Sequence, residues 1–262
     1  MTANRDVVAC GEIVNGCRKR IKGRQELKCS CGKLRNDCPV WSAFNETSAP
    51  SSFWTHEALV MRLLGHIGSR YAILSDSSKT AWGSITSPFR LRRRLGGDLY
   101  LVHLVRDPRA VCWSTVRLVE RRRTKRWGAK PRGESWSARQ LSRPLARYLR
   151  TAFGWWIANA SCEVFGWLYP DQYMRINYER FACAPQPVLQ ALFTKISHAT
   201  DFQLAEIGIN DNRHQLYGNR MRRHRLRFSD VRPDTGWQSE MPRVYRRLVS
   251  ALTWPLRAKY GY

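Results

Sequence analysis

Residues 99–114 hold the side chains of this sequence that are best suited to bind a phosphate group. An uncharged run ends at Arg106, and Ser114 follows eight positions later. The guanidinium of an arginine is a planar fork of donors that matches phosphate geometry, and a serine hydroxyl is a further donor. Pro108 favours the start of a helix, which would carry Ser114 two turns along. The spacing predicts an anion site, although a buried strand end whose arginine pairs with an acid would also explain Arg106.

A second group of polar residues, Asp76-Ser77-Ser78-Lys79, follows a short strand that we expect at Tyr71 to Leu74. Lys79 would supply a point charge that neutralises a phosphate or sulfonate oxygen. The same four residues are also typical of a capped helix start, in which Asp or Ser accepts hydrogen bonds from free backbone N–H groups. Both interpretations stay open on the sequence alone.

Alternating strands and helices would position these residues. Tyr100 to Val105 is rich in β-branched and aromatic residues, which is typical of a strand buried on both faces of a parallel sheet. Helices are expected from about Thr55 to Ser69 and after Pro108. This alternation predicts an α/β fold with three layers, in which helices flank a parallel sheet. Because such sheets bind ligands at the carboxyl ends of their strands, Arg106 would face the binding crevice.

The second half of the chain should supply a long helix from about Leu141 to Trp167, a strand from Tyr173 to Ile176 and a last helix from about Pro242 to Lys259. Helical spacing predicts that the long helix packs on the core through one apolar face. That face consists of Leu145, Leu149, Phe153, Trp156 and Ile157. The last helix would dock on the sheet through Val244, Leu248, Leu252 and Leu256.

The composition indicates one folded and strongly basic domain. A hydrophobic content of 43% excludes wholesale disorder, and we expect a single domain over residues 1–262 with an irregular Cys-bearing segment at 16–52 and a basic loop at 120–139. The longest apolar run, Phe153 to Tyr169, is too interrupted for a membrane span, and no secretion signal opens the sequence, so we expect a cytoplasmic protein. The formal net charge of +25 predicts attraction to acidic or polyanionic partners.

Arg106-Asp107-Pro108-Arg109 with Ser114 resembles the 3′-phosphate-binding motif of sulfotransferases that use 3′-phosphoadenosine 5′-phosphosulfate (PAPS). Further segments are similar, in the same order along the chain, to bacterial-type and tyrosylprotein-type members of that family. They are Cys10-Gly11-Glu12, Cys29-Ser30-Cys31-Gly32, Cys38-Pro39-Val40-Trp41, Asp76 to Lys79, Asn177-Tyr178-Glu179, His214-x-x-x-Gly218-Asn219 and Pro255 to Tyr262. The resemblance spans almost the whole chain.

The resemblance implies an enzyme of P-loop-like sulfotransferase fold that transfers a sulfuryl group from PAPS to a hydroxyl or amine and requires no metal. It implies that Arg106 and Ser114 hold the 3′-phosphate. Lys79 would stabilise charge on the bridging oxygen, and Glu12 would be the general base. A carboxylate within hydrogen-bond reach of the acceptor hydroxyl suits this reaction, whereas a lone Glu near a chain end is usually only solvated.

Further contacts to the nucleotide are implied in the same way. Ser77 and Ser78 would contact the donor or its sulfuryl group. Tyr178 would lie by the adenine, although core packing explains a tyrosine at that strand end equally well. Asn219 and Arg222 belong to a segment similar to the late loop that closes over the nucleotide, for which a solvated basic loop is the alternative.

One element of the family is missing from this sequence. Members begin with a strand and a Ser/Gly/Thr-rich loop whose backbone donors bind the 5′-phosphosulfate, whereas the first matched segment here, Val7 to Glu12, corresponds to a region after that loop. We expect a chain shortened at its amino end, either because the true start of the reading frame lies upstream or because the protein is a degenerate or truncated member. The loss of oxyanion-type donors predicts weak binding of adenosine 3′,5′-bisphosphate and slow turnover.

The cysteines at 29, 31 and 38 raise the question of a metal. Zinc usually takes four ligands with two to four residues between the members of a pair, whereas one residue separates Cys29 from Cys31. Cys10 or Cys17 could supply a fourth ligand, since no histidine lies between Cys10 and Trp41. We rank a disulfide or packed thiols above zinc and predict no metal.

Two other functions remain to be weighed. The arginine clusters favour a non-catalytic protein of the same fold that binds polyanions, or nucleic acid only non-specifically, because no nucleic-acid-binding motif accompanies them. A nucleotide kinase or other P-loop enzyme is disfavoured, because the Gly-x-x-x-x-Gly-Lys-Ser/Thr loop is absent.

Overall fold

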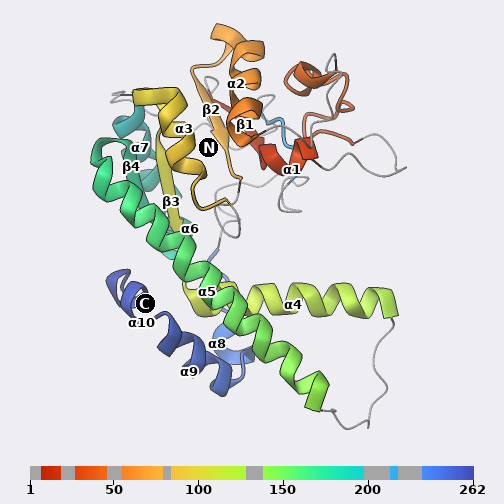
Figure 1. Ribbon diagram of the computed structural model, residues 1–262, viewed down its shortest axis with the longest axis vertical. Helices are drawn as coiled ribbons and strands as arrows, with labels where there is room; N and C mark the ends of the chain where they lie inside the picture. The colour runs from red at the N-terminus through yellow and green to blue at the C-terminus, as the bar shows by residue number, and fades with distance from the viewer. Residues whose placement is uncertain are drawn as a thin grey trace. The chain divides into compact units, whose positions relative to one another are not determined.

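The computed structural model of the protein describes residues 7–18, 27–45, 55–78, 84–127, 138–197, 213–217 and 232–262 (Figure 1). The chain divides into two compact units. The first comprises Met1–Thr80, Ser87–Leu99 and Ala184–Val231, and the second comprises Ala81–Thr86, Tyr100–Cys183 and Arg232–Tyr262. The single domain expected from the sequence stays a prediction.

The first unit contains two parallel strands, β1 (Val7–Gly11) and β2 (Ile73–Asp76). Its helices are α1 (Ile13–Arg18), α2 (His56–Ile67), α3 (Ser87–Leu95) and α7 (Pro185–Ser197), with 3-10 turns at Trp41–Phe44, Gly68–Arg70 and Gly96–Asp98. Thr55 caps α2, because its hydroxyl accepts a hydrogen bond from the Ala58 N–H at 3.2 Å. The helix predicted from about Thr55 is thereby confirmed, whereas β2 begins two residues later than expected.

Residues 213–217 extend the sheet of the first unit on the side of β1. The His214 N–H donates to the carbonyl of Ala9 at 2.9 Å, and Ala9 forms a parallel bridge with Arg213. Gly11 ends β1 with a φ of +69°, and a Cβ there would lie 2.7 Å from the carbonyl oxygen of Tyr217. Only glycine accommodates both this backbone conformation and this close approach.

The second unit contains the parallel strands β3 (Leu101–Val105) and β4 (Tyr173–Asn177), which pair in register from Leu101 with Tyr173 to Val105 with Asn177. Its helices are α4 (Pro108–Trp127), α5 (Ala138–Leu168), α6 (Tyr178–Cys183), α8 (Trp237–Glu240), α9 (Arg243–Leu252) and α10 (Trp254–Lys259), with a 3-10 turn at Pro170–Gln172. Because α4 continues to Trp127, residues 120–127 of the predicted basic loop are helical. Residues 128–137 lie outside the described residues.

The face that α5 buries differs from the predicted one. The residues Leu145, Leu149, Phe153 and Trp156 are exposed. The buried side chains are instead Tyr148, Ala152, Trp155, Asn159, Cys162 and Phe165. Apolar residues line both faces of this helix, so spacing alone does not select one. Packing selects it: the Tyr148 ring stacks on that of Tyr245 in α9, with the ring centroids 4.4 Å apart.

The last predicted helix is interrupted at Thr253, which separates α9 from α10. Pro255, at the start of α10, cannot donate to the hydrogen bonds of a continuous helix. Val244 and Leu252 are exposed, and α9 buries Val249 instead. The predicted docking face is therefore wrong for Val244 and Leu252, whereas Leu248 and Leu256 are half-buried.

The α/β class and the parallel pairing are as the sequence predicts. Within the described residues, the strands form two two-stranded sheets, because no described strand pairs with both β2 and β3. A single sheet in three layers thus stays a prediction. None of the helices in the described ranges combines the length and the apolar content that a membrane crossing requires.

Candidate functional site at the strand ends

In the second unit, the carboxyl ends of β3 and β4 meet, as expected for parallel neighbours. The Asp107 N–H donates to a carboxylate oxygen of Glu179 at 3.4 Å. The hydroxyl of Tyr262 donates to the other carboxylate oxygen of Glu179 and to the carbonyl of Val105, the latter at 3.3 Å. Tyr262 thus links the ends of the two strands. Arg106 directly follows the end of β3.

Asp107 fixes the turn from β3 into α4. Its carboxylate accepts from the backbone N–H of Arg109 at 2.8 Å and from the Arg109 guanidinium at 2.6 Å. The Arg109 guanidinium also lies 4.6 Å from the centroid of the Trp237 ring. The contacts of Arg109 thus stabilise the turn itself. Arg106 is therefore the arginine of this turn that can bind a ligand.

Arg106 follows β3 with a side chain that is 22% exposed. Its guanidinium carbon lies 4.6 Å from the centroid of the Tyr178 ring, and Nη2 donates to Asp234 at 3.1 Å. Its Nε is buried and has no hydrogen-bond partner among the described residues. The arginine does pair with an acid, but the Asp234 side chain is 64% exposed. The structure therefore pairs Arg106 with an acid, as the alternative interpretation of the sequence expects, but this acid lies at the surface.

The other predicted residues of the second unit are placed as follows. Ser114 lies two turns into α4 with an exposed side chain. Tyr178 begins α6, and its ring lies against the Arg106 guanidinium, a contact that stabilises the planar cation. A shared anion pocket of Arg106 and Ser114, and adenine contact by Tyr178, stay predictions.

In the first unit, Asp76 at the end of β2 organises the turn between β1 and α1. One oxygen of its carboxylate accepts from the backbone N–H groups of Ile13 and Ser78 at 3.2 and 2.9 Å, and from the Ser78 hydroxyl at 2.8 Å. The other oxygen lies 2.5 Å from Nε2 of His56. The Ser78 hydroxyl in turn accepts from the Val14 N–H at 3.3 Å. Capping of α1 therefore accounts for the positions of Asp76 and Ser78.

Glu12 and Ser77 lie at the same turn. Glu12 is only 8% exposed, its carboxylate accepts a hydrogen bond from the Asn15 amide, and its backbone N–H donates to Tyr217 at 3.4 Å. The Ser77 N–H donates to the Gly11 carbonyl at 2.8 Å, and its side chain is exposed. The catalytic role of Glu12 and the donor contacts of Ser77 and Ser78 stay predictions. Lys79, Asn219 and Arg222 lie outside the described residues.

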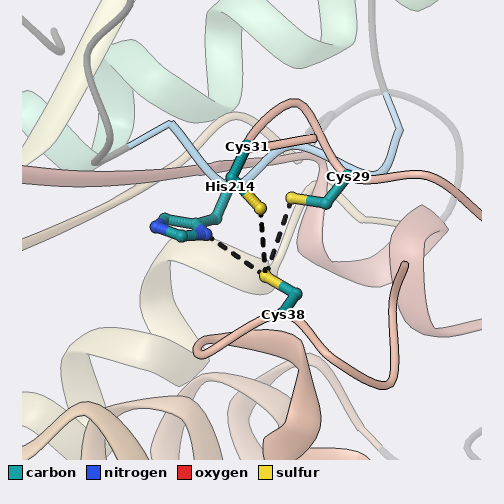
Figure 2. A group of neighbouring side chains, drawn as sticks. All are labelled: Cys29, Cys31, Cys38 and His214. Carbon is teal, nitrogen blue, oxygen red and sulfur yellow. Dashed lines mark hydrogen bonds between the residues drawn. The ribbon is translucent and has the colours of Figure 1, made fainter. Parts of the chain in front are cut away.

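The sequence did not predict a group that the first unit brings together, namely Cys29, Cys31, Cys38 and His214 (Figure 2). Their four potential ligand atoms all lie within 4.8 Å of one another. The expected fourth ligand was Cys10 or Cys17, whereas the structure supplies His214. No local pattern could have found it, since 176 positions separate Cys38 from His214.

The thiols of the first unit differ in acidity. Hydrogen bonding to Cys29, together with hydrogen bonding to His214, lowers the pKa of the Cys38 thiol well below its usual range. Burial raises the pKa of the Cys10 thiol, and it raises that of Cys17 to about 12. These shifts favour the protonated thiol at Cys10 and Cys17 and the thiolate at Cys38.

No family model matches the sequence, and a comparison with curated proteins found no match. Among solved structures, the chain is similar to the sulfotransferase domain of the olefin synthase from Synechococcus PCC 7002, with 14% identity over 99% of this chain and 96% of that chain and a TM-score of 0.55. The sulfotransferase domain from the curacin biosynthetic pathway matches with 15% identity over 94% of this chain and 95% of that chain, at a TM-score of 0.45. The first of these two likenesses shows the fold of a sulfotransferase domain.

Proposed function

We propose that this chain, which has the fold of a sulfotransferase domain, transfers a sulfuryl group from PAPS to a hydroxyl or amine acceptor. The proposal rests on the environment of the Arg106 side chain. Its guanidinium lies at the carboxyl end of β3 against Tyr178, with a buried Nε that has no partner among the described residues. A 3′-phosphate would give this cation the bidentate partner that the surface residue Asp234 supplies only in part.

By analogy with phosphoryl transfer, the protein contributes mainly positioning and charge stabilisation. Arg106 binds the 3′-phosphate, and Ser114 adds a hydroxyl from α4. Lys79 stabilises the charge that develops on the bridging oxygen, and Glu12 accepts the proton of the acceptor. PAPS is the donor, and no metal takes part in the transfer itself.

The other predicted site residues bind the donor nucleotide. Ser77, Ser78, Tyr178, Asn219 and Arg222 contact the donor. The net charge of +25 favours an acidic or polyanionic acceptor.

A second candidate is a polyanion-binding protein of the same fold without catalytic activity. One observation favours it: the arginines of α3 line a surface recess of the first unit. The residues of this recess are Thr55, Glu57, Arg90, Arg93 and Arg94. Binding of this kind falls steeply with salt concentration and does not depend on the nucleotide.

Calorimetric titration with adenosine 3′,5′-bisphosphate tests the proposal and separates the two functions. The wild-type chain should give saturable binding that Arg106→Ala weakens by about 10-fold or more, because a charge-assisted bidentate pair contributes about 1.5–3 kcal/mol. Arg243→Ala is the matched control, since Arg243 is an exposed arginine of the same unit at the start of α9. Equal affinity in the Arg106 and Arg243 variants would exclude a nucleotide site at Arg106.

A further inference from the structure

The three dashed lines in Figure 2 converge on the sulfur of Cys38. It is 3.7 Å from the Cys29 sulfur, 3.8 Å from the Cys31 sulfur and 3.2 Å from Nδ1 of His214. A disulfide would bring two sulfurs to about 2.05 Å, so these cysteines are free thiols. Of the two alternatives that the sequence analysis ranked above zinc, a disulfide and packed thiols, the structure shows packed thiols.

We propose that Cys29, Cys31, Cys38 and His214 bind one zinc ion as a closed structural site. A tetrahedral ion with Zn–S bonds of about 2.3 Å separates its sulfur ligands by about 3.8 Å. Both sulfur separations at Cys38 match this edge length. The same geometry predicts about 3.6 Å between a sulfur and an imidazole nitrogen. Nδ1 of His214, which lies 3.2 Å from the Cys38 sulfur, would therefore move away from it by only a few tenths of an ångström.

The donor set selects the class of metal. Thiolates and an imidazole are ligands of zinc, whereas magnesium and calcium require oxygen ligands, of which this cluster has none. Cys29, Cys38 and His214 are at most 3% exposed. Four protein ligands leave no coordination position for a substrate, which is the arrangement of a structural rather than a catalytic zinc site.

The short spacing that disfavoured zinc is accommodated by the backbone. The Gly32 N–H donates to the Cys29 carbonyl at 3.0 Å, and the Cys29 N–H donates to the Lys33 carbonyl at 2.9 Å. Gly32 adopts a φ of +91°, which lets the chain turn back directly after Cys31. The turn presents the two sulfurs to the same side, towards Cys38 (Figure 2).

Hydrogen bonds hold His214 in place from the backbone side. Its N–H donates to Ala9 at 2.9 Å, and its carbonyl accepts from the Trp41 indole N–H at 2.6 Å. Nδ1 then faces Cys38, and Nε2 is buried without a hydrogen-bond partner among the described residues. Coordination through Nδ1 would place the ring proton on Nε2 and would fix this tautomer.

The ion would fasten residues 27–38 to the segment 213–217. Around Ser30, three hydrogen bonds already join them: the hydroxyl donates to Arg213 at 2.7 Å and accepts from the Gln215 N–H at 2.8 Å, and the Ser30 N–H donates to Gln215 at 3.1 Å. If the proposed function holds, zinc also anchors residues 213–217, which closely precede Asn219 and Arg222 in the sequence. The zinc site itself does not depend on that function.

Metal analysis of the full chain, purified under reducing conditions without chelator, tests the site. We expect about one zinc ion per chain, and visible absorption of tetrahedral cobalt when Co²⁺ replaces it. Cys38→Ser and His214→Ala should lose the metal, whereas His214→Cys should retain it, because four thiolates also bind zinc. Cys112→Ser is the control, since Cys112 is a buried free thiol of the second unit and should leave the zinc content unchanged.

Three results would overturn the proposal. The first is a wild-type protein with reduced thiols that neither contains zinc nor takes up added Zn²⁺. The second is a mass lower by two hydrogens, which would show a disulfide among the three cysteines, and the third is equal zinc loss in Cys112→Ser and Cys38→Ser. Circular dichroism of each variant separates loss of a ligand from loss of folding, and His214→Cys decides the case if both other variants unfold. Arg106→Ala should keep its zinc, so that failure of the nucleotide site is distinguishable from failure of the metal site.

Discussion

Nη2 of Arg106 donates a hydrogen bond to Asp234 at 3.1 Å, although 128 positions of sequence separate the two residues. The Asp234 side chain is 64% exposed, so water competes for its carboxylate. Surface pairs of this kind contribute only about 0–1 kcal/mol. Asp234 is therefore a weak partner that an incoming phosphate can displace from Arg106.

Removal of this competing carboxylate should tighten nucleotide binding. We expect Asp234→Asn to bind adenosine 3′,5′-bisphosphate up to about fivefold more tightly, which corresponds to a pair worth at most about 1 kcal/mol. Calorimetry measures the affinity. Glu240→Gln is the matched control, because Glu240 is an exposed carboxylate of the same unit that pairs with Arg117. The displacement model fails if the two variants gain affinity equally, since that would reflect net charge alone.

The carboxylate of Glu163 should make the stability of the second unit depend on pH. It accepts hydrogen bonds from Lys259 at 2.5 Å, from Arg175 at 3.1 Å and from the Tyr173 hydroxyl at 3.2 Å. Burial by itself would raise its pKa, but the hydrogen bonds and charges of Lys259 and Arg175 outweigh burial and lower the pKa to about 2. Because the folded pKa lies below the unfolded value of about 4.3, the stabilisation is present above pH 4.3 and is lost as the pH falls towards 2.

Glu163→Gln should therefore lower the free energy of unfolding at pH 7 by up to about 3 kcal/mol. This deficit relative to the wild type should shrink steadily as the pH falls from 5 towards 2, because the wild-type carboxylate then becomes protonated as well. Urea unfolding at a series of pH values measures it, with Glu240→Gln as the exposed control. A deficit that does not change with pH would mean that packing, and not charge, explains the effect.

Gly11 should be intolerant of a side chain for two separate reasons. Its φ is +69°, and an added Cβ would lie 2.7 Å from the Tyr217 carbonyl oxygen. Gly68 has a φ of +52° with nothing within 4 Å of the corresponding Cβ, so it reports backbone strain without a steric clash. We expect Gly68→Ala to cost about 1–2 kcal/mol and Gly11→Ala about 1–3 kcal/mol more. Urea unfolding measures the free energy of unfolding of both variants. Equal losses of stability would mean that residues 213–217 move to make room for the added methyl group.

Local patterns in the sequence sufficed to predict the elements that carry the candidate site. The run up to Val105 forms β3, Pro108 begins α4, and the helix predicted after Thr55 forms as α2. These predictions depend on side chains within a few positions of one another, because strand burial, capping and the fixed φ of proline act over one or two turns of chain. Parallel pairing followed from the order of strands and helices.

Tertiary structure alone decided which residues meet. The pairing of Arg106 with Asp234, the approach of His214 to Cys38 and the choice of Tyr148 for the buried face of α5 all join segments more than 90 positions apart, or select between two similar faces. The periodicity of a sequence does not predict such contacts, because their free energy comes from packing and desolvation in the folded chain. The sequence specified the groups that could bind an anion or a metal, and the fold determined which of them lie close enough to do so.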